Sequence, residues 1–337
     1  MDKLILFNKA KRNKLLNKRV GESKFGEHVK ILSHLSNIYD DLKSLDVTYV
    51  IIGVPEDIGI FANYGNTGTS KTWNSFLKAL INIQNNQFTE AKNVLILGHL
   101  CFKEDLLTIS KLDSSKKKDI EYARKLVAQI DAQVTYLIHQ IISAGKKPII
   151  IGGGHNNAYG IIKGTSLALG EPINAINFDA HTDFRPEEGR HSGNGFSYAY
   201  AEGFLKKYMI FGIHENYTPE KTFKTLKKLK SVKYVTFEAL EVRKTLTFKA
   251  EMQSALAYIE KKPFGLEIDC HAIQNINSSA MTPSGFSVNK TRAFINFFGK
   301  HDHVQYLHIC EAAITKKTAQ QTGKLITYLV TDFIKAS

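Results

Sequence analysis

The chain has 337 residues, of which 43% are hydrophobic, enough to bury the core of one large α/β domain or two ordinary ones. Lys and Arg outnumber Asp and Glu by 45 to 32, a net charge of +13 at pH 7. The lysines are scattered along the chain, and no helix-turn-helix, zinc-finger or RNA-binding motif accompanies them. We therefore expect no nucleic-acid partner.

Cysteine content and the N-terminal residues bear on location. The three cysteines, Cys101, Cys270 and Cys310, give no disulfide framework. The N-terminal residues "MDKLILFNKAKRNK" lack the apolar core of a signal peptide, and no apolar run approaches the roughly 18 residues of a transmembrane helix. These features predict a cytoplasmic protein without membrane contact. We expect the basic segment from residue 1 to about residue 24 to be frayed.

Short apolar runs rich in β-branched residues alternate with helical patterns along the chain. The expected strands cover 49–54, 93–98, 147–154, 173–181, 208–213, 232–237, 264–270 and 304–310. Helical periodicity covers 25–45, 70–84, 119–145, 157–169, 219–230, 250–261, 288–300 and 317–335. This alternation predicts an α/β fold in one domain, 1–337, with three layers: a mostly parallel sheet of about eight strands and helices on both faces.

Ligands of such sheets bind beyond the carboxyl ends of the strands, and several expected strands end in polar residues. The strand at 147–151 runs into three glycines and His155. Glycines let the backbone turn sharply and approach a ligand closely, so they deliver His155 to the end of the strand. Taken alone, this histidine is more often a hydrogen-bonded structural residue.

The strand at 173–178 runs into Asp179-Ala180-His181-Thr182-Asp183. Burying two carboxylates without a counterion costs several kcal/mol each, and a divalent metal provides the counterion. Carboxylates together with imidazoles suit manganese, iron, cobalt, nickel or zinc. A loop neutralised by Arg185 and Arg190 is the alternative interpretation.

Two later strands end in further acidic and imidazole groups. Residues 265–273 read "GLEIDCHAI", in which Glu267, Asp269 and His271 alternate and so share one face of a strand. Glu311 directly follows the strand at 304–310. We expect Cys270 and Cys310, which alternate with these residues, to pack away from the metals. The four strand ends together supply enough carboxylates and imidazoles for a pair of metal ions, which can generate a hydroxide at neutral pH.

These motifs resemble those of the ureohydrolase family, which comprises arginases, agmatinases and formimidoylglutamases. The family motifs GG-D/G-H, D-A-H-x-D and S-x-D-x-D are similar to "GGGH" at 152–155, "DAHTD" at 179–183 and, less closely, "EIDCH" at 267–271. Residues 50–80 look like the first strand, Gly-rich loop and helix of the family. The resemblance implies the arginase-like three-layer fold and, by analogy, a homo-oligomer.

The resemblance also implies roles for individual residues. Two divalent ions, manganese above all, would be held by His155, Asp179, His181, Asp183, Asp269 and His271. Asp179 and Asp269 would bridge the ions. The catalytic residues would be Asp183 and Glu311, and Glu311 would also pair with the amidine or guanidine part of the substrate. Substrate contacts would come from Arg185, Arg190, Ser192, Asn194 and Glu311.

His271 departs from the family pattern if Leu-Glu-Ile-Asp-Cys-His at 266–271 is aligned on the family's Leu-Ser-Ile-Asp-Leu-Asp, because the aligned family residue is then an aspartate. In the alternative alignment, Glu267 and Asp269 are the two acids of the motif. In the first alignment, three carboxylates instead of four would face two dications, which weakens the second metal site. Glu267 is a candidate compensating ligand. The chain is therefore either a two-metal enzyme with an altered metal preference, or a degenerate one-metal or inactive relative that acts as a binding or assembly protein.

The substrate is inferred from the loop that follows the DAHTD motif. Arg185 and Arg190 flank the family's substrate loop, here "HSGNGF" at 191–196, and arginine suits carboxylates. Pairing of these arginines with neighbouring glutamates is the alternative. The resemblance implies hydrolysis of N-formimidoyl-L-glutamate to L-glutamate and formamide, a step of histidine degradation, by a metal-bridging hydroxide. The alternative substrates are arginine, agmatine or a guanidino acid.

Overall fold

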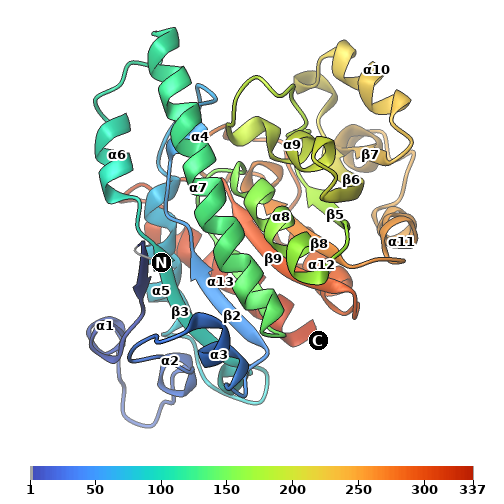
Figure 1. Ribbon diagram of the computed structural model, residues 1–337. Helices are drawn as coiled ribbons and strands as arrows, with labels where there is room; N and C mark the ends of the chain where they lie inside the picture. The colour runs from blue at the N-terminus through green and yellow to red at the C-terminus, as the bar shows by residue number, and fades with distance from the viewer. Residues whose placement is uncertain (1–2, 337) are drawn as a thin grey trace.

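The computed structural model describes residues 3–336, and these form a nine-stranded sheet covered by helices (Figure 1). The strands are β1 (Leu4–Leu6), β2 (Tyr49–Gly53), β3 (Val94–Leu100), β4 (Lys147–Ile151), β5 (Ile173–Phe178), β6 (Leu205–Ile213), β7 (Val232–Thr236), β8 (Phe264–Asp269) and β9 (Val304–Cys310). The eight predicted strands are confirmed. The ninth, β1, lies in the N-terminal segment that was expected to be frayed.

The strands are ordered β1-β3-β2-β4-β9-β8-β5-β6-β7 across the sheet. All neighbours pair in parallel except β1, which is antiparallel to β3. The carboxyl ends of β2 to β9 therefore meet at one edge of the sheet. The strands β4, β9, β8 and β5 are consecutive neighbours in the middle of the sheet, and they are the ones whose ends carry the predicted site residues.

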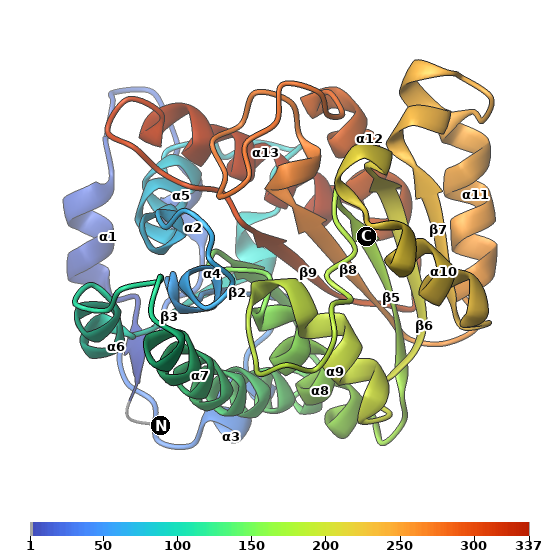
Figure 2. The ribbon, with the colours of Figure 1, turned by 90° about the horizontal axis from the view of Figure 1, so that it is seen from above.

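Helices cover both faces of the sheet, as Figure 2 shows from above. The helices are α1 (Lys9–Leu15), α2 (Phe25–His28), α3 (Ile38–Lys43), α4 (Ile58–Phe61), α5 (Thr72–Leu80), α6 (Lys103–Ile109), α7 (Lys117–Ser143), α8 (Asn157–Leu169), α9 (Gly195–Ala201), α10 (Glu220–Lys228), α11 (Phe248–Ile259), α12 (Val288–Gly299) and α13 (Ala319–Ala336). The predicted helix at 25–45 is two short helices instead, α2 and α3.

Two separate apolar cores explain why the central strands are apolar at every position. Ile149 and Ile151 of β4 pack into the core beneath α5, α11, α12 and α13, whereas Ile150 packs into the core beneath α7, α8 and α9. A strand of a parallel sheet that is buried on both faces has this continuous apolar sequence. The sequence prediction of a three-layer α/β fold is confirmed.

The N-terminal segment is part of the fold. Leu4, Ile5 and Leu6 pair with Leu100, His99 and Gly98 of β3, and Phe7 is buried in the core beneath α5. Gly98 permits this pairing, because a Cβ atom there would lie 2.1 Å from the carbonyl oxygen of Ile5. An apolar run of only three residues is too short for sequence periodicity to identify as a strand.

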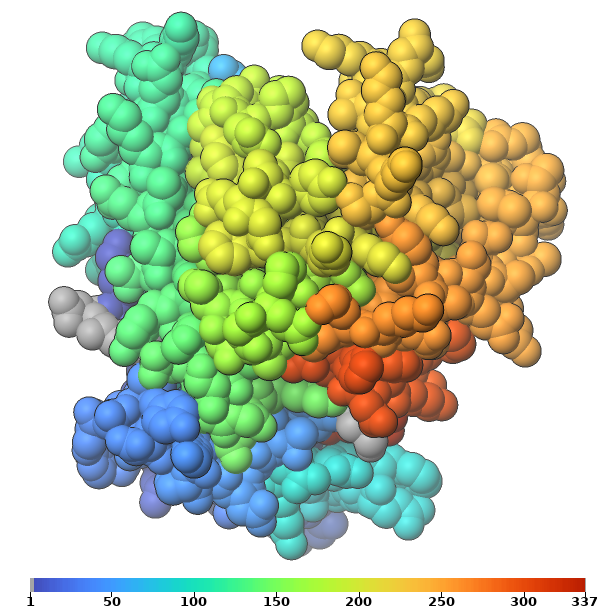
Figure 3. Space-filling view, turned by 45° about the vertical axis from the view of Figure 1, so that its right-hand side comes forward, coloured from blue at the N-terminus to red at the C-terminus, as the bar shows by residue number. Residues whose placement is uncertain are grey.

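At the edge of the sheet formed by β7, α10, coloured yellow, stands out from the neighbouring surface in the space-filling view (Figure 3). Among residues 3–336, no helix is both long enough and apolar enough to span a membrane.

Candidate metal centre and active site

Four neighbouring strands bring the predicted site residues together. His155 follows β4, Glu311 follows β9, Asp269 ends β8, and Asp179 follows β5. All four side chains are buried, with at most 1% of each residue exposed. The order of the strands in the sheet, which cannot be read from one sequence, makes these residues neighbours.

The loop between β4 and α8 is shaped by glycine and by a buried acid. Gly153 has φ +78°, and a Cβ atom on Gly154 would lie 2.6 Å from Oδ1 of Asn156. Glu56, which is fully buried, accepts hydrogen bonds from the backbone N–H of Gly154 at 2.8 Å and from Nδ2 of Asn157 at 2.9 Å. Glu56 thereby holds the turn that presents His155, and no motif in the sequence indicates this role.

One group of potential metal ligands surrounds Nδ1 of His155. This atom lies 2.8 Å from Oδ2 of Asp183, 3.2 Å from Oδ2 of Asp269 and 3.4 Å from Oδ2 of Asp179. Burial lowers the pKa of His155, but charge at Cys310 and hydrogen bonds with the three aspartates raise the pKa well above its ordinary value. Such a cluster binds a proton tightly, and a divalent cation is the natural replacement for that proton.

A second group consists of Asp179, His181, Asp269 and His271, whose ligand atoms lie within 4.8 Å of one another. Nδ1 of His271 lies 3.2 Å from Oδ1 of Asp269, and Nδ1 of His181 lies 3.6 Å from Oδ1 of Asp179. Asp179 and Asp269 belong to both groups. Their two oxygens face different groups, as bridging carboxylates require.

The tautomer of His271 decides whether the second group can bind a cation. Nε2 lies 2.9 Å from Oγ of Ser279 and 3.0 Å from the backbone nitrogen of Ala280. If Nε2 donates to Ser279, the lone pair of Nδ1 is free to bind metal. If Nε2 accepts from Ala280, the proton is on Nδ1 and faces Asp269. Nδ1 is buried and makes no hydrogen bond, which fits a metal ligand.

Glu311 lies beside both groups. Its Oε1 accepts a hydrogen bond from the backbone N–H of His155 at 2.8 Å, and its Oε2 accepts one from Ser279 at 2.7 Å. Burial raises the pKa of Glu311 to about 7, although the positive charge of His271 opposes this shift. Both Asp183 and Glu311 have positive φ, 44° and 62°. Backbone strain of this kind in non-glycine residues is concentrated at functional sites.

The two arginines of the predicted substrate loop have different environments. Arg190 is buried: Nε donates to Asp131 at 2.8 Å, Nη2 to the carbonyl of Asn156 at 2.8 Å, and Nη1 to Oδ1 of Asn194 at 2.5 Å. The guanidinium of Arg190 is thus used within the protein, and the side chain of Asn194 supports the same loop through Pro186 and Gly189. Arg190 thus pairs with Asp131 and not with a neighbouring glutamate, whereas the alternative of pairing with a neighbouring glutamate is seen for Arg185 and Glu188.

Arg185 is half-exposed, with 50% of its side chain accessible. It donates to Oδ1 of Asn63 at 3.0 Å and to Glu188 at 3.0 Å, and Asn63 also donates to Oγ of Ser192 at 3.2 Å. Asn63 was not identified from the sequence, because it is distant in the chain and has no motif. Together, Arg185, Asn63 and Ser192 form a polar cluster, in which the side chain of Arg185 is half-exposed and Ser192 is buried.

Glu267 lies outside both groups of metal ligands. Its carboxylate accepts hydrogen bonds from Tyr306 at 2.7 Å and from Nδ1 of His308 at 2.6 Å. Burial raises the pKa of Glu267, but the positive charge of His308 and its hydrogen bond outweigh this effect and hold the pKa at about 2. Glu267 and Asp269 lie in β8, but His271 lies in the 3-10 helix Cys270–Ala272 that follows the strand, so the three residues do not share one strand face. Glu267 lies two residues before the strand end and contacts His308 of β9.

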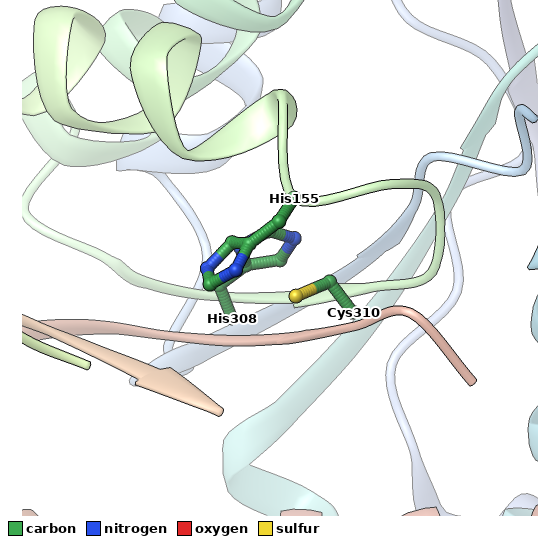
Figure 4. Close-up of side chains that lie close together, drawn as sticks. All are labelled: His155, His308 and Cys310. Atoms are coloured by element: carbon green, nitrogen blue, oxygen red, sulfur yellow. The ribbon is translucent and has the colours of Figure 1, made fainter. Parts of the chain in front are cut away.

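Cys310 also differs from expectation, because it lies with His155 and His308 rather than away from the site (Figure 4). The potential ligand atoms of these three residues lie within 4.8 Å of one another, and all three residues are buried. In β9, Tyr306, His308 and Cys310 alternate on the face that pairs with Gly265, Glu267 and Asp269 of β8. The alternation of these three residues in the sequence is the feature from which this second group of buried polar side chains could have been predicted.

Comparison with known proteins agrees with the fold. Residues 47–335 match the arginase family, and the chain belongs to this family. The formimidoylglutamase of Streptococcus gordonii is 25% identical over 178 residues, 50% of this chain and 48% of the relative. That of Streptococcus pyogenes serotype M3 is 28% identical over 176 residues, 50% of this chain and 47% of the relative. The match thus spans about half the length of these curated relatives.

Solved structures share the fold. The formimidoylglutamase of Bacillus subtilis superposes with a TM-score of 0.72 at 15% identity, covering 95% of this chain and 93% of that chain. Trypanosoma cruzi formiminoglutamase, in a structure with Mn²⁺, gives a TM-score of 0.68 at 19% identity, covering 88% and 97%. At these identities the likeness establishes the arginase-like fold.

Proposed function

We propose that the chain is a metal-dependent hydrolase of linear amidines that converts N-formimidoyl-L-glutamate and water into L-glutamate and formamide. The convergence of His155 with Asp179, Asp183 and Asp269 carries this proposal, because three carboxylates around one imidazole nitrogen, two of them fully buried, favour a bound cation. The curated relatives of the two streptococci support the choice of reaction.

The protein groups have separate roles in this proposal. His155, Asp179, Asp183 and Asp269 would hold one ion, and the group that contains His181 and His271 would hold the other. Manganese is the proposed metal, and the ions would supply activated water and stabilise negative charge. Asp183 would transfer a proton to the glutamate nitrogen as its bond to the formimidoyl carbon breaks. Glu311 would pair with the amidinium of the bound substrate.

The anionic part of the substrate is assigned to the polar cluster of Arg185, Asn63 and Ser192. Arg185 is the candidate for carboxylate binding because its side chain is half-exposed, whereas that of Arg190 is buried against Asp131. Asn63 and Asn66 belong to one loop, and Asn66 donates to the carbonyl of Ser279, the residue that contacts Glu311. This loop connects the two ends of the proposed substrate site.

A substrate panel tests the proposal. Manganese-loaded protein should hydrolyse formimidoylglutamate with a higher kcat/KM than agmatine, arginine or guanidino acids. Arg185→Ala should raise KM for formimidoylglutamate roughly tenfold, the lower range for a hydrogen bond to a charged group, and should leave turnover of agmatine unchanged. Arg292→Ala is the matched control, since Arg292 pairs with Asp332 outside the site. A preference for agmatine or arginine would contradict the proposal.

The degenerate one-metal reading keeps one observation in its favour. The backbone N–H of Ala280 points at Nε2 of His271, which would place the ring proton on Nδ1 and exclude a second cation. A single metal per chain, without hydrolysis of any substrate in the panel, would support this reading.

We also propose a homo-oligomer by family resemblance, which light scattering in solution would test.

A further inference from the structure

A layer of buried polar side chains lies beneath His155, on the side away from the three aspartates. Its centre is Glu267, which accepts hydrogen bonds from Tyr306 and from Nδ1 of His308. Tyr306, His308 and Glu267 are all fully buried. A buried carboxylate held in this way is costly to desolvate, so it calls for an explanation beyond packing.

The two ring nitrogens of His155 face different groups. Nδ1 faces the aspartates, so its lone pair must be free if His155 is to bind a cation there. The proton of the neutral ring is then on Nε2. This nitrogen is buried, makes no hydrogen bond, and lies 3.5 Å from Oε2 of Glu267. Metal-binding histidines usually donate their other N–H to a carboxylate or carbonyl, which fixes tautomer and ring orientation.

The strand pairing shows that the layer is built for this arrangement. Gly265 pairs with Tyr306 and Glu267 pairs with His308 in the β8–β9 register. A Cβ atom on Gly265 would lie 2.1 Å from the Tyr306 ring and hydroxyl, so only glycine leaves room for the tyrosine that fixes Glu267.

We infer that Glu267, held by Tyr306 and His308, is a positioning residue that keeps the proton of His155 on Nε2 and so directs Nδ1 to the metal group. The inference rests on the proposed metal centre. It assigns Glu267 a role one layer behind the ligands, in place of the ligand role that the sequence suggested.

A different use of the same residues makes a distinct prediction. His155, His308 and Cys310 are close enough to hold an ion themselves (Figure 4). An ion bound there through Nε2 of His155 would compete with the donation to Glu267. The Glu267 interaction is favoured because the His308 ring is already oriented by its hydrogen bond to that carboxylate, and because Nδ1 of His155 contacts three aspartates.

Metal affinity of the metal-free protein, measured by calorimetric titration with Mn²⁺, tests the inference. Glu267→Gln should weaken the first Mn²⁺ bound by about 10- to 100-fold, the usual effect of losing such an outer partner. Asp332→Asn, which removes another partly buried acid far from the site, should change it less than twofold. A merely structural role would lower the melting temperature of Glu267→Gln but leave its Mn²⁺ affinity equal to wild type, which would overturn the inference.

The ring tautomer gives a readout that needs no variant. In zinc-loaded wild-type protein with ¹⁵N-labelled histidine, the His155 signals should show a protonated Nε2 and a metal-bound Nδ1. A protonated Nδ1 would overturn the inference. In cobalt-loaded protein, a cobalt–thiolate absorption band would place the metal at Cys310 and would also overturn it. If the wild-type protein bound no metal at all, the proposed function would fail instead.

Discussion

His191 is a residue whose environment sets its protonation state. It is fully buried, Nδ1 accepts a hydrogen bond from the backbone N–H of Gly193 at 3.1 Å, and Nε2 lies 3.2 Å from Glu188. Burial, followed by the positive charges of Arg185, Arg124 and Arg190, lowers the pKa of His191 from 6.5 to about 3. The folded protein therefore keeps this ring neutral at a pH where the unfolded chain would protonate it.

The resulting pH dependence has a definite sign. Between pH 6.5 and about 3 the unfolded state binds one more proton at His191, so stability falls as the pH falls. His191→Gln should remove up to ~1.4 kcal/mol per pH unit of that slope in the free energy of unfolding. Urea titrations of both proteins across this range would measure the difference. Parallel curves for wild type and variant would contradict the lowered pKa.

At the scale of elements, the turn between β4 and α8 requires glycine at position 153. Gly153 has φ +78°, and a Cβ atom there would lie 2.4 Å from Nδ2 of Asn157 and 2.7 Å from the carbonyl oxygen of Val54. The matched control is Gly170, which ends α8 with φ +70° and has no atom within 4 Å of the added Cβ. The two positions separate backbone strain from steric contact.

Gly170→Ala should lower the free energy of unfolding by about 1 kcal/mol, because alanine is strained in the left-handed backbone conformation. Gly153→Ala should lower it by at least about twice as much, because contact with the rigid backbone of Val54 adds to that strain. It should also weaken Mn²⁺ binding, since His155 follows the turn directly. Denaturant unfolding and metal titration would measure both effects. Equal costs at the two glycines would show that the loop relaxes freely.

The proposed metal centre joins elements that are far apart in the chain, which matters at the scale of the whole molecule. The candidate ligands lie at or just after the carboxyl ends of β4, β5 and β8. A bound ion would therefore connect the ends of these central strands. A ligand that binds only the folded state stabilises that state by mass action. We expect Mn²⁺ at 100 times its dissociation constant to add about 2.7 kcal/mol to the free energy of unfolding.

Removal of metal by a chelator should therefore lower the melting temperature, and re-addition should restore it. The double variant Asp183→Asn with Asp269→Asn should show no such shift, because it removes two carboxylates from the group around His155. Differential scanning calorimetry with a metal count per chain would measure both quantities. A melting temperature that is indifferent to metal in the wild-type protein would argue against a structural connection of this kind.

The sequence by itself determined the α/β class and eight of the nine strands, and it indicated the residues of the proposed metal centre. Continuous apolar strands and polar strand ends are local features, so they are legible along the chain. His155, the DAHTD motif at 179–183, Asp269 and Glu311 were identified in this way.

Only the tertiary structure decided which of these residues meet and which point elsewhere. The strand order β4-β9-β8-β5 places His155 beside Asp269, and the β8–β9 register places Tyr306 and His308 against Glu267. Arg190, buried against Asp131 of α7, could not be separated from the half-exposed Arg185 by sequence. Such pairings join residues tens of positions apart, and their energies depend on burial and distance, neither of which a residue type or a spacing specifies.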